Sequence, residues 1–229
     1  MTDTLKDVLA TLLIGGVMIY PLFALAVVAS AIILDKAILY GGRTRLPAAL
    51  IDIVETYGFA WDDLKRELTG MRATNYARRF LGVIVQHRAQ PAWWVESRAG
   101  DEASQVEQAL GRWLWVLETT VTAAPLLGLL GTIVGMIRAF NLFGRQGLVD
   151  PAGVTGGVAE ALIATAVGLF VALLALFAFN FFARRQAQFM DELERLGTRL
   201  VDHIRLDQER PGEPAVPPVA AVRHAGGRA

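Results

Sequence analysis

The chain has 229 residues, of which 54% are hydrophobic and only 19% are charged, and its formal net charge at neutral pH is zero. It contains no cysteine, which excludes a disulfide scaffold and a thiolate metal site. This composition is that of an integral membrane protein, and the balanced charge argues against a nucleic-acid partner.

Three uncharged stretches predict three membrane-spanning segments, over residues 8–34, 119–137 and 161–183. Each is about as long as a helix that crosses a bilayer, roughly 20 residues. Backbone amides cannot stay unpaired in hydrocarbon, and these stretches lack the alternation of barrel strands. We therefore expect an all-α integral membrane protein with three transmembrane helices.

The first stretch resembles a secretory signal, because small residues at 29–31 could form a cleavage site. Its flank contains Asp3 and Asp7 beside a single lysine, and its apolar run is about twice the usual length of a signal, roughly 7–15 residues. We therefore interpret residues 1–35 as a short N-terminal segment followed by a retained helix. Pro21 predicts a kink or a loosened turn within that helix.

Residues 36–115 are long enough to form several helices between the first and second spans. From Ser97 onward the pattern continues without a helix breaker into the second span, which predicts one long helix. Glycine and proline mark the expected breaks in this segment, at Gly41–Gly42, Gly58, Gly70 and Pro91.

The third span is followed by a second amphipathic segment, residues 184–208. Its apolar residues recur at helical spacing, at Phe189, Leu193, Leu196, Leu200 and Ile204. We expect this helix to pack with the long helix before the second span as a cytoplasmic bundle. Residues 209–229 are rich in proline and glycine and are predicted to be a disordered tail.

Orientation follows from the lysines and arginines near the span ends. The larger set is at Lys36, Arg43, Arg45, Arg98, Arg112, Arg184, Arg185, Arg195 and Arg199, and the smaller at Lys6, Arg138 and Arg145. This predicts a periplasmic N-terminus and a cytoplasmic C-terminus. A periplasmic loop at 141–155 would then join spans at 116–140 and 156–183, with Trp113 and Trp115 at the inner membrane interface.

Three polar residues of the predicted second and third spans call for an explanation in terms of packing or transport, namely Thr132, Glu160 and Thr165. Counted from the outer span ends, the two threonines lie at matching depth and can face each other, whereas Glu160 lies roughly 140° around the axis from Thr165 and about one turn inside its helix. A threonine in a membrane helix often bonds back to its own helix, and an acid in the first turn complements the helix dipole. An ionisable residue in a span is nevertheless a functional-site candidate by default.

The same two spans carry small residues that allow close helix packing. These are Gly128, Gly131 and Gly135, in a helix that also contains Pro125, opposite a stripe of Ala161, Thr165, Gly168, Ala172 and Ala175. The histidines, His87, His203 and His224, all fall outside the spans. We expect no catalytic residue, metal site or cofactor, which disfavours an intramembrane enzyme.

The runs APLLGLLGTIVGMIRAF and GGVAEALIATAVGLFVALLALFAFN resemble the second and third spans of the MotA/TolQ/ExbB proton channel family. Pro125, the glycines, Thr132, Glu160 and Thr165 occur in the family's order. The three-span layout is similar to ExbB and TolQ, between which the sequence does not decide. MotA proteins are usually longer and have four spans.

The resemblance implies a homopentameric ring in the bacterial inner membrane. Its second and third spans would line a channel around a dimer of single-span partners similar to ExbD or TolR, whose membrane aspartate carries protons. Thr132 and Thr165 would line the proton path, and Glu160 would tune proton access or hold helix contacts. A periplasm-spanning protein similar to TonB or TolA would transmit the work to the outer membrane, with membrane lipids surrounding the ring.

Two rival interpretations stay open at this stage: a flagellar stator subunit, and a structural membrane scaffold without ion conduction. Arg138 has two interpretations, since it either reaches the lipid headgroups or pairs with Glu160. The driving ion is either proton or sodium, and the lack of extra carboxylates near mid-span favours proton.

Overall fold

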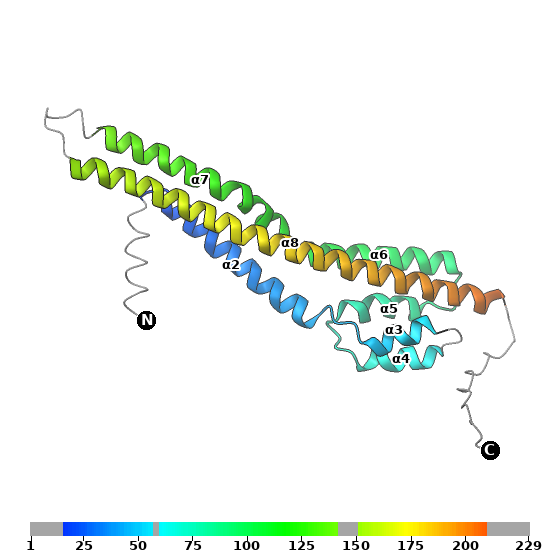
Figure 1. The fold of residues 1–229 in the computed structure, drawn as a ribbon. Coiled ribbons are helices and arrows are strands. Elements are labelled where there is room, and N and C mark those ends of the chain that lie inside the picture. The colour runs from blue at the N-terminus through cyan, green and yellow to red at the C-terminus, as the bar shows by residue number, and fades with distance from the viewer. Residues whose placement is uncertain (1–15, 57–59, 142–150, 210–229) are drawn as a thin grey trace, which may run out of the picture. The chain divides into compact units, whose positions relative to one another are not determined.

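The computed structural model describes residues 16–56, 60–141 and 151–209 of the chain. Every regular element within those residues is an α-helix (Figure 1). The helices are α2 (Ile19–Gly42), α3 (Ala48–Glu55), α4 (Trp61–Gly70), α5 (Tyr76–Gln86), α6 (Ala92–Gly111), α7 (Leu114–Asn141) and α8 (Pro151–Glu209). The predicted all-α class is confirmed.

The chain divides into two compact units. The span unit comprises the residues up to Ile38 together with Gly111–Arg185, and the bundle unit comprises Leu39–Leu110 together with the residues from Gln186 onward. Within the part of the chain that the structure describes, three helical segments are long and apolar enough to cross a membrane, namely Ile19–Gly42, Ala92–Asn141 and Gly153–Glu209. Large apolar side chains such as Leu126 and Phe170 stay more than 60% exposed, as expected for surfaces that face lipid.

Helix α2 differs from the predicted first span at both described ends. It begins at Ile19, so Pro21 lies in the first turn, where backbone N–H groups have no partner within the helix anyway and no interior kink results. It continues past residue 34 to Gly42, because no helix breaker occurs before Gly41. The charged pair at 35 and 36 does not end the helix, and the Lys36 side chain is 1% exposed.

The prediction of one unbroken helix from Ser97 into the second span is wrong. A turn at Arg112 and Trp113 separates α6 from α7, and Trp113 has a left-handed backbone with φ of 68°. That conformation costs about 1–2 kcal/mol for a residue with a side chain. The Arg112 guanidinium lies over the Trp113 ring, 5.1 Å from its centroid, and provides a compensating cation–π contact.

Helix α8 is continuous from Pro151 to Glu209, so the predicted extension of the third span is confirmed. It begins five residues before the expected start at 156, because proline is well suited to the first helical turn. Glu160 therefore lies about two and a half turns into the helix, and its predicted place in the first turn is wrong. The expected break at Gly58, most of the loop 141–155 and nearly all of the tail 209–229 lie outside the described residues.

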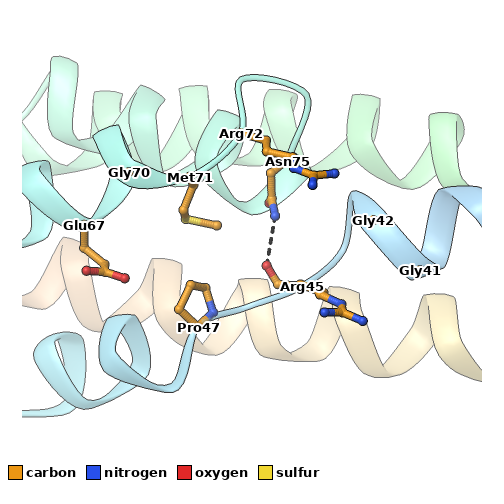
Figure 2. Close-up of a pocket in the computed structure, with 9 residues that line it drawn as sticks. All are labelled: Gly41, Gly42, Arg45, Pro47, Glu67, Gly70, Met71, Arg72 and Asn75. Atoms are coloured by element: carbon orange, nitrogen blue, oxygen red, sulfur yellow. Dashed lines mark hydrogen bonds between the residues drawn. The ribbon is translucent and has the colours of Figure 1, made fainter.

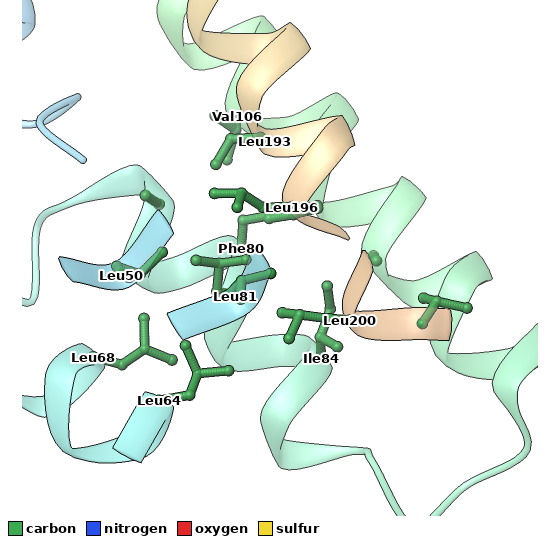
Figure 3. Close-up of a cluster of buried hydrophobic side chains, with 14 of the residues drawn as sticks. Leu50, Leu64, Leu68, Phe80, Leu81, Ile84, Val106, Leu193, Leu196 and Leu200 are labelled. Carbon is green, nitrogen blue, oxygen red and sulfur yellow. The ribbon is translucent and has the colours of Figure 1, made fainter. Parts of the chain in front are cut away.

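The bundle unit has its own hydrophobic core (Figure 3). All five residues expected on the apolar face of the C-terminal helix are buried in it: Phe189, Leu193, Leu196, Leu200 and Ile204. They pack with apolar residues of α3 to α6, including Leu50, Leu64, Leu81 and Val106. The predicted packing of two extended helices in one bundle is confirmed.

Polar contacts fix the ends of the bundle helices. The Asn75 side chain caps α5 by accepting from the backbone N–H of Ala77 at 2.8 Å. The indole of Trp61 donates to Asp207 at 2.7 Å and joins α4 to the end of α8. Arg205 pairs with Glu96 of α6 at 2.9 Å.

Candidate functional site

Within the span unit, α7 packs against the first half of α8 through small residues (Figure 1). A Cβ atom added to Gly128 would lie 3.0 Å from the Thr165 Cα, and one added to Gly131 would lie 2.6 Å from the Ala164 Cβ. One added to Gly135 would lie 2.8 Å from the Ala161 Cβ. The two backbones approach too closely for larger side chains at these positions.

The contact continues at Gly168, where an added Cβ would lie 2.6 Å from the Ala124 carbonyl oxygen and 3.1 Å from the Gly128 Cα. Ala124 precedes Pro125, which lies inside α7 and has no N–H to donate to the preceding turn. Ala124 also belongs to a small apolar cluster with Leu22 of α2 and Val171 and Ala172 of α8. The first helix thus joins the α7–α8 pair at this level.

Thr165 makes a hydrogen bond between the two helices. Its Oγ1 donates to the Gly128 carbonyl oxygen at 2.8 Å. A threonine in a membrane helix more often bonds within its own helix, but the missing side chain at Gly128 brings this carbonyl within reach. Hydrogen bonds of this kind contribute about 0.6 kcal/mol on average in a membrane protein.

Thr132 behaves differently. Its Oγ1 donates to the Leu129 carbonyl oxygen of the same helix at 2.7 Å, and the residue is half-buried. Gly128 contacts Thr165 and Gly131 contacts Ala164, so Thr132 and Thr165 differ in depth along the helix pair by about one helical turn or less. Each hydroxyl donates to a different carbonyl, so the structure brings them to similar depth without joining them.

Glu160 forms an ion pair with Arg138 of α7. The Arg138 Nη1 and Glu160 Oε1 atoms are 3.0 Å apart, and the side chains are 48% and 23% exposed. Of the two interpretations of Arg138, the structure favours pairing with Glu160 over reaching for headgroups.

Gly16 completes this cluster, which the sequence analysis missed. It has a φ of 68°, and a Cβ atom at this position would overlap the Glu160 carboxylate. The left-handed backbone favours glycine here, and the Glu160 carboxylate would have to move to make room for a Cβ atom. The adjacent glycines at 15 and 16, within the first apolar run, were the available signal.

Glu160 and Thr165 thus make separate sets of contacts in the span unit. Gly16, Arg138 and Glu160 form one cluster, which joins the start of α2, the end of α7 and α8. Thr165 is five residues further along α8, about 7.5 Å in rise, and faces Gly128. Among the described residues, no group of three or more histidines and acids gathers as a metal site would require.

Comparison with known proteins gives the family. Residues 72–195, which include α7 and the span part of α8, match the MotA/TolQ/ExbB proton channel family. The chain belongs to this family. The expected resemblance is thereby confirmed, and the family is one of proton channels and not of enzymes.

Family members with similar sequences carry the ExbB name. The putative biopolymer transport protein ExbB-like 3 of Synechocystis sp. is 33% identical over 73% of this chain and 81% of its own length. The putative biopolymer transport protein ExbB-like 1 of the same organism is 30% identical over 81% of this chain and 74% of its own length. The biopolymer transport protein ExbB of Aquifex aeolicus is 38% identical over 36% of this chain and 55% of its own length.

Proposed function

We propose that this member of the MotA/TolQ/ExbB family is the ring-forming subunit of a proton-driven motor in the bacterial inner membrane. The motor would couple the proton gradient to biopolymer transport or other work at the outer membrane. Family membership and ExbB-named relatives support this proposal. The single observation that carries it is the pair of threonine hydroxyls at similar depth on two closely packed helices.

The hydroxyls of Thr132 and Thr165 suit a proton path. Each donates its hydrogen to a backbone carbonyl, so its oxygen lone pairs stay available to accept from water or from a carboxylic acid. Such acceptors can pass a proton on without holding a fixed charge, which conduction requires. A ring of five subunits would present five such pairs around a central channel.

The acid that carries the proton would come from a partner. The sequence has no aspartate within residues 19–34, 119–137 or 161–183. A dimer of single-span proteins similar to ExbD or TolR would supply a membrane aspartate inside the ring. A periplasm-spanning protein similar to TonB or TolA would receive the resulting motion.

Glu160 would act as a positioning residue at the outer end of the path. Its ion pair with Arg138 and its close approach to Gly16 support this role. These contacts connect α8 to α7 and to the segment just before α2, all at a similar depth. The chain would be oriented with its N-terminus in the periplasm and its C-terminus in the cytoplasm. The bundle unit would then lie in the cytoplasm.

The test is proton uptake by liposomes that contain the full chain together with its ExbD/TolR-like partner. A potassium diffusion potential drives uptake, and an internal pH-sensitive dye reports it. We expect uptake with both proteins, and only background uptake with either protein alone. Background uptake by a correctly assembled complex would contradict the channel and favour a structural scaffold.

A further inference from the structure

The bundle unit contains a pocket of about 540 Å³ beside the end of α2 (Figure 2). This volume is within the range of small-molecule sites, about 300–1,000 Å³. Glycines and two arginines line it, with a proline, an acid, a methionine and an asparagine: Gly41, Gly42, Arg45, Pro47, Glu67, Gly70, Met71, Arg72 and Asn75.

Three glycines line the pocket. A Cβ atom added to Gly41, Gly42 or Gly70 would meet no other atom within 4 Å, and none of the three has a left-handed φ. The backbone therefore does not need glycine at these positions, unlike at Gly16. A larger side chain at each of these positions would start in open space.

Arg45 and Arg72 give the pocket a positive end. Within the described residues, no acid lies within ion-pairing distance of either guanidinium, whereas Arg79, Arg195 and Arg205 of the same unit all have acidic partners. In Figure 2 both guanidinium groups extend toward the side of Gly41 and Gly42, and Glu67 is at the opposite end of the pocket. Both arginines are exposed and line the same pocket, so an anion in it would have two candidate cationic partners.

A buried asparagine holds both arginines in place. Asn75 is 5% exposed, and its side-chain amide donates to the Arg45 carbonyl oxygen at 2.9 Å. Its backbone N–H donates to the Arg72 carbonyl oxygen, also at 2.9 Å. The backbone at two arginines 27 residues apart in the sequence is thus hydrogen-bonded to one residue, to Arg45 through its side chain and to Arg72 through its main chain.

The position of the pocket indicates the kind of ligand. The uncharged part of α2 ends at Leu34, and the same helix continues for eight residues to Gly42, about 12 Å in rise. In the orientation of the proposed function, on which this step rests, the residues directly after α2 would face the cytoplasm close to the end of the span. Arginine binds phosphate through two parallel hydrogen bonds, and basic pockets next to a span attract anionic headgroups. We propose that this pocket binds the phosphate of an anionic phospholipid headgroup through Arg45 and Arg72.

The test is native mass spectrometry of the purified full chain in neutral detergent. Phosphatidylglycerol and phosphatidylcholine with the same acyl chains are added at equal concentration, and bound lipid is counted. We expect a preference for phosphatidylglycerol that falls about tenfold in the Arg45→Gln/Arg72→Gln variant. Arg199→Gln is the matched control, because this arginine is exposed in the same unit and has no ion pair to a described residue.

A second variant tests the shape of the pocket independently of its charge. Gly42→Leu fills the hollow and keeps both arginines, so it should lower phosphatidylglycerol binding with an unchanged unfolding temperature. Retention of the preference in both this variant and the double arginine variant would overturn the proposal. Equal binding of phosphatidylglycerol and phosphatidylcholine by the wild-type chain would also overturn it, and binding of inorganic phosphate in that case would indicate a site for a free phosphate compound.

Discussion

Arg138 and Glu160 form an ion pair of 3.0 Å that joins the last turn of α7 to α8. A double-mutant cycle with Arg138→Gln and Glu160→Gln should give a coupling energy of about 0.2–1 kcal/mol, because the Arg138 side chain is half exposed. Thermal unfolding in detergent, followed by circular dichroism, measures it. A coupling energy of zero would show that the pair does not hold these helices together.

Gly16→Ala should destabilise the span unit by about 1–2 kcal/mol, because Gly16 has a left-handed backbone and the Glu160 carboxylate would have to move away from the new methyl group. The matched control is Gly100→Ala in α6. Nothing lies within 4 Å of an added Cβ there, and alanine should stabilise this helix interior by up to about 1 kcal/mol. Equal unfolding temperatures for the two variants would contradict the left-handed backbone conformation of Gly16.

Gly168→Ala should weaken the α7–α8 contact by about 1–3 kcal/mol, because the new methyl group would press on the Ala124 carbonyl and the Gly128 backbone. Gly156→Ala is the control in the same helix, where an added Cβ meets nothing within 4 Å. The unfolding temperature and the yield of folded protein purified in detergent distinguish the two variants. A Gly168→Ala variant as stable as wild type would argue against the observed helix register.

Leu196→Ala should lower the free energy of unfolding of the bundle unit by about 2–5 kcal/mol, because this side chain is fully buried in the core (Figure 3). Leu206→Ala in the same helix should cost much less, since Leu206 is 40% exposed. Limited proteolysis of the full chain reports the difference, because a loosened bundle exposes cleavage sites. Similar proteolysis rates for the two variants would be inconsistent with the described core.

The sequence predicted the elements that depend on composition and on the spacing of apolar residues. Apolar stretches marked the spans, and the spacing from Phe189 to Ile204 predicted which face of α8 is buried. The turn at Trp113 was not predictable, because neither glycine nor proline occupies the left-handed position and tryptophan rarely adopts it.

The chemistry of the candidate site depended on details that a sequence does not contain. The depth of Thr165 followed from counting residues, but its acceptor did not, because the Gly128 carbonyl is accessible only where the two backbones nearly touch. Similarly, both interpretations of Arg138 fitted the sequence, and only the helix register placed it beside Glu160.

The most direct test of the proposed proton path is proton uptake by the reconstituted complex with Thr165→Val and Thr165→Ser. Valine keeps the shape and removes the hydroxyl, which costs only the modest hydrogen bond to Gly128, so the complex should still co-purify with its partner. We predict background uptake for valine and substantial uptake for serine. Wild-type uptake by an intact Thr165→Val complex would contradict a role for this hydroxyl in proton transfer.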